Sequence, residues 1–187
     1  MHADRDFLTG QILAEHSKAQ TMRIVRWVGH DADRLALLME IFLGKPHPQP
    51  LPKAGGEQYR LTQRSAWAVR YVGENAPELM TPWLPKMVAQ LRRPGIHDAV
   101  KRNVLVVFEA LEVPDNLHDE LADLCFGCLA NPNEAIAIHC AAMSILEKIC
   151  RKVPELKPEL RLLIEEYYEH GSAGFKSRAR KVLKGIG

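Results

Sequence analysis

Apolar residues recur every three or four positions along this chain, in blocks separated by short breaks that contain proline, glycine or polar residues. This spacing is typical of amphipathic helices. In residues 75–112 the pattern predicts one helix over Pro77–Arg92 and a second over Ala99–Glu112, joined by a short Arg-Pro-Gly break. Stretches of the same build lie on both sides. We therefore predict a series of helical hairpins, each with a first helix (helix A) and a second helix (helix B).

The residues at the expected helix ends support this division. Thr81 and Pro82 suit the N-cap and first position of an A helix, because a threonine hydroxyl accepts hydrogen bonds from free N–H groups and proline has no N–H to satisfy. Asp98 suits the N-cap of the B helix that follows. The other predicted helices are Asp4–Glu15, Ser17–Gly29, Ala32–Leu43, Gln58–Gly73, Asp115–Ala130, Glu134–Lys152, Pro158–His170 and Phe175–Lys184.

One segment, residues 45–56 (KPHPQPLPKAGG), interrupts the series. Four prolines and two glycines in twelve residues exclude a regular helix or a central strand. We predict an exposed loop insertion with polyproline character. A loop that binds a partner is the alternative interpretation.

The predicted hairpins repeat along the chain. Three B helices begin alike, with Val100-Lys101, Ile138-His139 and Phe175-Lys176, at offsets of 38 and 37 residues. Earlier, the pattern of residues 25–29 (VRWVG) returns 44 residues later in residues 69–73 (VRYVG). A period of about 40 residues with two helices per unit is typical of an α-solenoid. One hairpin alone exposes too much apolar surface, so neighbouring hairpins must stack on each other.

The stretch 129–146 carries a family resemblance. It combines an Asn131-Pro132-Asn133 turn with Ile138-His139, two alanines and Ile145-Leu146, and it resembles the HEAT repeat, in which a short Asp/Asn-Pro turn precedes Val-Arg, small residues and leucine on helix B. The tail Ser172–Lys184 and the Arg64–Trp67 pattern are also similar to small bacterial HEAT-type proteins. The resemblance is strongest in residues 115–151 and weakest in residues 4–29.

The resemblance implies an all-α fold, a right-handed α-α superhelix (solenoid) of about five HEAT-like hairpins. We expect residues 1–187 to form a single repeat domain with residues 45–56 as its loop insertion. In HEAT-like proteins the B helices line the concave side. The exposed residues of the B helices would then line a groove.

Charge is divided unequally between the two kinds of helix. The net charge of the whole chain is only +2. Counted with their flanking residues, the predicted A helices (3–15, 31–43, 75–92, 115–130 and 155–170) contain 6 basic and 16 acidic residues. The predicted B helices, counted in the same way (16–29, 57–74, 98–112, 134–152 and 175–187), contain 16 basic and 7 acidic residues. A concave surface lined with one sign of charge attracts the opposite sign. We therefore expect a basic concave face and an acidic outer face.

The candidate binding residues follow from this division. Lys101, His139 and Lys176 each follow the first apolar residue of a B helix, and Arg64 is the nearest equivalent in its own helix. Other arginines surround them on the B helices. The predicted site consists of Arg23, Arg26, Arg64, Lys101, Arg102, His139, Lys176 and Arg180. We interpret it as a surface for an acidic segment of another protein. Nucleic acid is the alternative partner, and pairing of these bases with carboxylates of neighbouring repeats is the structural interpretation.

Two other groups of residues suggest chemistry only weakly. Cys125 and Cys128 have the spacing of a metal or redox motif, but no second such pair exists, so we predict reduced thiols inside helices. Zinc binding and a disulfide are the less favoured alternatives. The run His118-Asp119-Glu120 opens a predicted helix, where carboxylates stabilise the helix dipole.

Four aromatic residues, Trp27, Trp67, Tyr71 and Trp83, suggest a further alternative. The fold also resembles the HEAT-like alkylpurine DNA glycosylases, in which aromatic residues stack on bases. Three of the four lie on apolar stripes of predicted B helices, so we interpret them as core residues.

The sequence contains no phosphate-binding loop, dinucleotide-binding fingerprint or serine-nucleophile motif. We therefore predict a non-catalytic binding scaffold that needs no cofactor and no metal. The alternative is a nucleic-acid binding protein related to the glycosylases. The start of the chain lacks a secretory signal and no apolar run reaches membrane-spanning length, so we expect a cytoplasmic location and no membrane partner.

Overall fold

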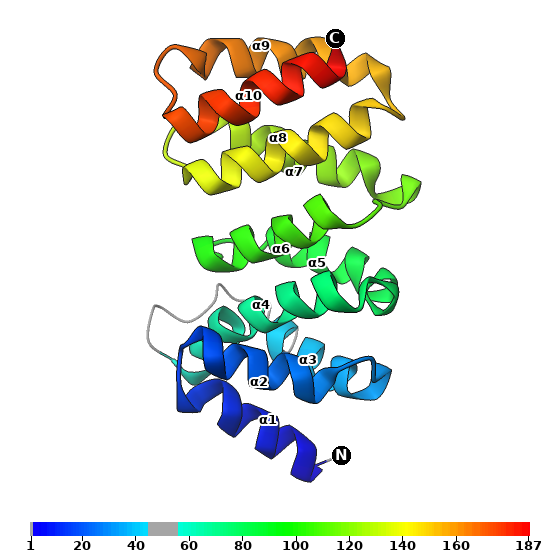
Figure 1. The fold of residues 1–187 in the computed structure, drawn as a ribbon, viewed down its shortest axis with the longest axis vertical. Coiled ribbons are helices and arrows are strands. Elements are labelled where there is room, and N and C mark those ends of the chain that lie inside the picture. Colours follow the sequence, from blue (N-terminus) through cyan, green and yellow to red (C-terminus); the bar gives the residue numbers. More distant parts are fainter. Residues whose placement is uncertain (1, 45–55) are drawn as a thin grey trace. The chain divides into compact units, whose positions relative to one another are not determined.

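The computed structural model describes residues 2–44 and 56–187, and in this part of the chain all regular secondary structure is helical (Figure 1). The all-α fold class is confirmed. The predicted loop insertion lies outside the described residues except for Gly56. The described α-helices are α1 (His2–Ala14), α2 (Lys18–Val28), α3 (Ala32–Leu43), α4 (Glu57–Asn75), α5 (Leu84–Leu91), α6 (Asp98–Ala110), α7 (His118–Ala130), α8 (Ile136–Cys150), α9 (Lys157–Tyr168) and α10 (Ala173–Ile186).

The helices divide into two compact units. Met1–Leu111 contains α1–α6 and is called unit 1, and Glu112–Gly187 contains α7–α10 and is called unit 2. The odd-numbered helices correspond to the predicted A helices and the even-numbered helices to the predicted B helices. The single repeat domain over residues 1–187 stays a prediction.

In unit 1, helix α4 is the centre of the packing. It lies between α2 and α6 in a layer of B helices, with α3 packed against it from the second layer (Figure 1). Its buried side includes Ala68, Val69 and Val72, each at most 1% exposed. Gly73 continues this side, and a Cβ atom there would lie 3.4 Å from both methyl carbons of Val107 on α6. A Cβ atom at Gly73 would thus be in ordinary contact with α6, and a larger side chain would not fit between α4 and α6.

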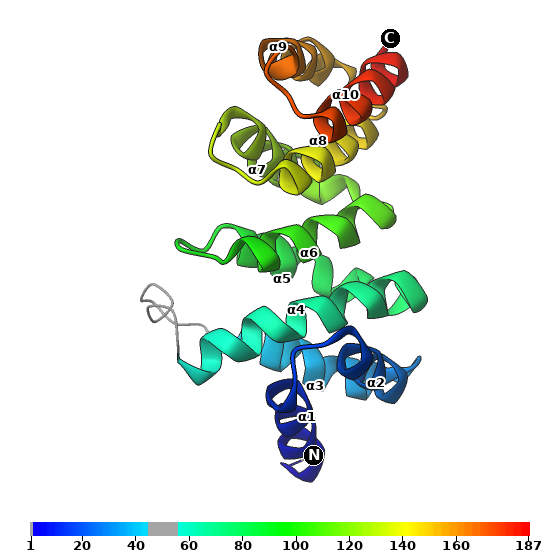
Figure 2. The ribbon, with the colours of Figure 1, turned by 60° about the vertical axis from the view of Figure 1, so that its left-hand side comes forward.

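Unit 2 consists of two hairpins, α7–α8 and α9–α10 (Figure 2). Helix α8 packs against both α7 and α10. Ile138, Ile145 and Leu146 on α8 are fully buried, and so are Ala179 and Val182 on α10. Helical spacing of apolar residues on both sides of α8 therefore explains why one hairpin stacks on the next.

The predicted helix Pro77–Arg92 is shorter in the structure. Its first part forms two 3₁₀ turns, η1 (Pro77–Leu79) and η2 (Thr81–Trp83), and the α-helix begins only at Leu84. The prediction of Thr81 as N-cap was wrong, because Pro82 belongs to the second 3₁₀ turn and Pro85 occupies the first turn of α5. Prolines are tolerated only where no i→i−4 hydrogen bond is needed, so they delay the regular helix.

The N-cap of α6 also differs from the prediction. Asp98 is the first helical residue, and the preceding His97 is the cap. The Nδ1 atom of His97 accepts a hydrogen bond from the backbone N–H of Ala99 at 3.0 Å. At the C-terminal end, α10 begins at Ala173, two residues before the predicted start at Phe175, because Ser172 caps that helix through a bond from the N–H of Phe175.

Gly73 and Gly127 provide a test of this packing. We expect Gly73→Leu to lower the free energy of unfolding by about 1–3 kcal/mol, because the new side chain pushes α6 away from α4. Gly127 is also helical, but nothing lies within 4 Å of a Cβ atom built there. Gly127→Leu should therefore raise the free energy of unfolding by up to about 1 kcal/mol, through helix propensity alone. Urea unfolding followed by circular dichroism measures both, and equal effects would contradict the close α4–α6 contact.

Candidate partner-binding surface

The B helices of unit 1 keep some residues exposed or half-buried. Helix α4 packs against α1, α2, α3 and α6, and its exposed and half-buried positions include one set at helical spacing. We call Arg60, Arg64, Trp67, Tyr71 and Glu74 the α4 stripe; Arg60 and Glu74 are exposed and the other three are half-buried. The corresponding exposed or half-buried residues are Met22, Arg23, Arg26 and Trp27 on α2 (the α2 stripe) and Lys101, Arg102, Val106 and Glu109 on α6 (the α6 stripe). Helix α4 contacts both α2 and α6.

Two of the predicted binding residues, His139 and Lys176 in unit 2, form hydrogen bonds with carbonyl groups at the ends of A helices. His139 Nε2 lies 3.0 Å from the carbonyl oxygen of Asn131, the C-cap of α7. Lys176 donates from Nζ to the carbonyl oxygen of Glu169, the C-cap of α9, at 2.9 Å. The position after the first buried residue of helix B therefore faces the A–B turn. Basic side chains are favoured there because helix C-termini carry partial negative charge.

Arg64 has a similar role in unit 1. Its Nη1 atom donates to the carbonyl oxygen of Leu13 at 2.8 Å, next to the last residue of α1. Arg34 and Arg93 also donate hydrogen bonds to the ends of helices, at the carbonyl oxygens of Trp27 (2.7 Å) and Leu43 (2.9 Å). Part of the basic charge assigned to a partner thus has a structural use within each unit.

The remaining site residues of unit 1 are more accessible. Arg23 and Arg26 are exposed on α2, and Arg102 is exposed on α6 beside half-buried Lys101. Arg23 donates to Oε1 of Gln20 at 3.4 Å. Arg26 and Arg102, and also Arg60 on α4, have no hydrogen-bonding or ionic partner among residues 2–44 and 56–187. Consecutive B helices of this unit therefore each present an unpartnered guanidinium group.

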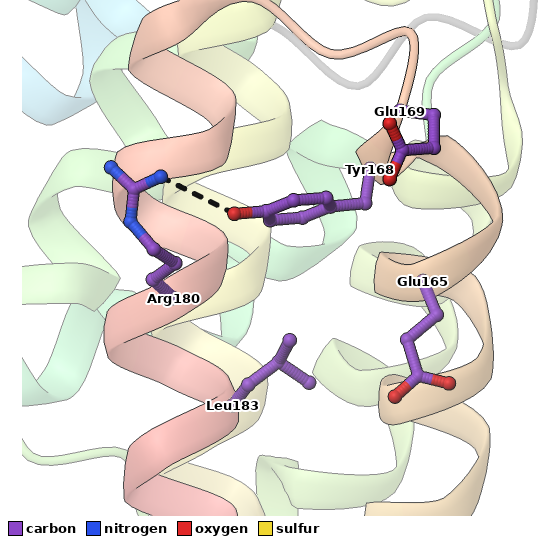
Figure 3. A pocket seen from close by; sticks show the side chains of 5 residues that line it. All are labelled: Glu165, Tyr168, Glu169, Arg180 and Leu183. Atoms are coloured by element: carbon purple, nitrogen blue, oxygen red, sulfur yellow. Dashed lines mark hydrogen bonds between the residues drawn. The ribbon is translucent and has the colours of Figure 1, made fainter.

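Arg180 lies in a different environment. It lines a shallow cavity of about 290 Å³ between α9 and α10, together with Glu165, Tyr168, Glu169 and Leu183 (Figure 3). Nη1 of Arg180 donates to the hydroxyl of Tyr168 at 3.3 Å. Two carboxylates on the α9 side oppose the positive charge of Arg180. The surface around Arg180 is therefore mixed in charge rather than uniformly basic.

The four aromatic residues are only half-buried, which differs from their interpretation as core residues. On α4 the rings of Trp67 and Tyr71 have centroids 6.3 Å apart. The exposed His16, in the α1–α2 turn, meets the Trp67 ring edge-on at 5.8 Å. His16 was not predicted as a member of this group, because it lies 51 positions from Trp67 and only the tertiary fold brings the two residues together.

The other candidate groups show structural roles. Asp119 and Glu120 lie in the first turn of α7, as the dipole argument predicts, and Nε2 of the buried His118 lies 3.1 Å from the carbonyl oxygen of Val113. All four cysteines have free thiols. In the described part of the chain, no three histidine, cysteine or carboxylate side chains come together as metal ligands do.

The comparison with known families agrees with this architecture. The model of a HEAT repeat domain matches residues 54–186, and the chain belongs to the HEAT repeat family. The HEAT-like α-solenoid class predicted from the sequence is thus confirmed. No curated protein and no solved structure matches the chain. Within residues 2–44 and 56–187, every helix is too short or too polar to span a membrane.

The capping role of Arg64 can be separated from a binding role by mutation. Arg64→Ala should lower the free energy of unfolding by about 1–3 kcal/mol, because a charged donor is lost at the end of α1. Arg60→Ala, one turn earlier on the same exposed stripe, should change it by less than about 0.5 kcal/mol. Chemical denaturation measures both. A neutral Arg64→Ala variant would contradict the structural role.

The cysteines give a test of burial in unit 2. Burial raises the pKa of the Cys125 thiol well above its ordinary range and also raises that of Cys150, because the thiolate loses its hydration. Cys128 and Cys140 are half-exposed. At mildly alkaline pH, iodoacetamide should therefore alkylate Cys128 and Cys140 about tenfold or more faster than the other two. Peptide mass mapping reads the result, and rapid native labelling of Cys125 would contradict it.

Proposed function

We propose that this protein is a non-catalytic binding scaffold, in which the uncovered stripes of α2, α4 and α6 hold an acidic segment of another protein. The observation that carries the proposal is the set of exposed, unpartnered arginines Arg26, Arg60 and Arg102 on three neighbouring B helices of unit 1. Membership of a repeat family that generally mediates protein interactions supports it. The cytoplasmic location stays a prediction.

Arginine favours a partner rich in carboxylates. A guanidinium group offers two parallel N–H donors that match a carboxylate, and it remains charged at any physiological pH. Arg23 and Lys101 add positive charge at the edges of the same surface. The stripes also face water, so the attraction depends on ionic strength and acts mainly on recognition and association rate.

A protein segment fits this surface better than a nucleic-acid backbone. Tight binding of duplex DNA depends on many simultaneous phosphate contacts. The α4 stripe carries a carboxylate, Glu74, which pairs with Arg70 at 2.8 Å, and Glu109 lies half-buried on α6. Carboxylates at these positions repel a continuous row of phosphates. An acidic peptide is able to place its charges opposite the arginines and neutral residues opposite the glutamates.

Charge reversal tests the proposal directly. The double variant Arg26→Glu/Arg102→Glu should weaken binding of a fluorescent polyglutamate peptide at low salt by about tenfold or more, because two attractive contacts become repulsive. The control is Lys86→Glu/Arg161→Glu, which makes the same change in net charge on the A helices α5 and α9. The control should bind nearly as well as the unmodified protein in fluorescence anisotropy.

Two results would count against the proposal. If both double variants lose affinity equally, the binding reflects net charge and not the stripes of unit 1. If the unmodified protein does not bind polyglutamate but binds duplex DNA with an affinity that falls steeply as salt is added, the partner is nucleic acid.

A further inference from the structure

The α4 stripe contains two large rings on a side of helix α4 that α1 and the α1–α2 turn cover only in part. Trp67 and Tyr71 lie one turn apart and are half-buried, whereas their neighbours Ala68 and Val72 are fully buried. His16 lies against Trp67 from the α1–α2 turn. These three residues, called the ring row, form a partly exposed aromatic strip among arginines. Residues needed only for the core would be covered on all sides.

The cations nearest to the ring row already have partners inside unit 1. Arg64 donates to the end of α1 at 2.8 Å. Arg70 pairs with Glu74 at 2.8 Å, and its guanidinium carbon lies 5.4 Å from the centroid of the Tyr71 ring. The contact of Arg70 with Tyr71 restrains that ring. Because Arg64 and Arg70 are both engaged in these contacts, neither is fully available to an anion. The ring row therefore offers mainly apolar and aromatic contact rather than an anion site.

The unpartnered Arg60 lies on the same stripe, seven residues before Trp67. Because an α-helix rises 1.5 Å per residue, the two positions are about 10 Å apart along α4. An extended peptide covers that distance in about three residues. A single segment bound along the α4 stripe would thus place a carboxylate at Arg60 and a side chain about three positions away at Trp67.

We infer that the ring row is an anchor site for one large apolar side chain, aromatic or leucine, of the acidic segment, spaced about three residues from its carboxylates. The inference rests on the proposed function and adds a sequence requirement to the partner. Buried aromatic contacts supply most of the affinity at many protein interfaces, whereas exposed charges mainly guide association. The anchor would therefore set how long the complex lasts.

The test compares two peptides of equal length and charge. One carries tryptophan three residues after a run of glutamates, and the other carries serine at that position. The unmodified protein should bind the tryptophan peptide about tenfold more tightly. Trp67→Ala and Tyr71→Ala should each reduce this preference severalfold, and circular dichroism checks that both variants remain folded. Trp83→Ala, outside the B helices, is the matched control and should keep the preference.

Equal binding of both peptides by the unmodified protein would overturn the anchor site and leave the acidic-segment scaffold intact. A preference that survives in both Trp67→Ala and Tyr71→Ala would also overturn it. If neither peptide binds, the proposed function and the anchor fail together. Tighter binding of a single-stranded oligonucleotide than of either peptide would assign the ring row to base stacking instead.

Discussion

The burial of the B helices is the constraint on which the rest of this structure depends. A two-helix hairpin has more apolar surface than it can cover alone. Within each unit the remaining apolar surface is buried where one B helix stacks on the next. Helix α4 packs against α1, α2, α3 and α6, and α8 packs against α7 and α10. The exposed and half-buried residues that remain on α4 include the α4 stripe. The surface available for a partner in unit 1 is therefore narrow, and the packing fixes which residues occupy it.

The division of charge between A and B helices has two physical origins. One is structural, because the last carbonyl groups of a helix need donors, and basic side chains such as Arg64, His139 and Lys176 supply them. The other concerns Arg26 and Arg102, which no internal contact in the described residues explains. Carboxylates also gather at the starts of helices, as at α7. Only the second group of arginines supports a partner of opposite charge.

The sequence predicted the helices well because their apolar residues follow the helical period closely; Ala32–Leu43 is reproduced to the residue. One error lies in Pro77–Arg92, where the prolines interrupt a helix that the apolar spacing predicts. Another is the N-cap of α6, which is His97 and not the predicted Asp98. The candidate site was harder to predict. A basic residue at a repeating position has the same sequence signature whether it faces a partner or a carbonyl group. The contact of His16 with Trp67 depends on how α1 and α2 fold back on α4, which no local pattern contains.

We propose above that a partner binds to the exposed side of α2, α4 and α6. An NMR titration of the protein with an acidic peptide that carries one aromatic residue, followed through the indole N–H signals of the tryptophans, tests this site. Trp67 lies on the α4 stripe, whereas Trp83 lies in η2, outside the B helices. We expect a saturable shift of the Trp67 signal and little change at Trp83. A shift at Trp83 with no change at Trp67 would contradict it.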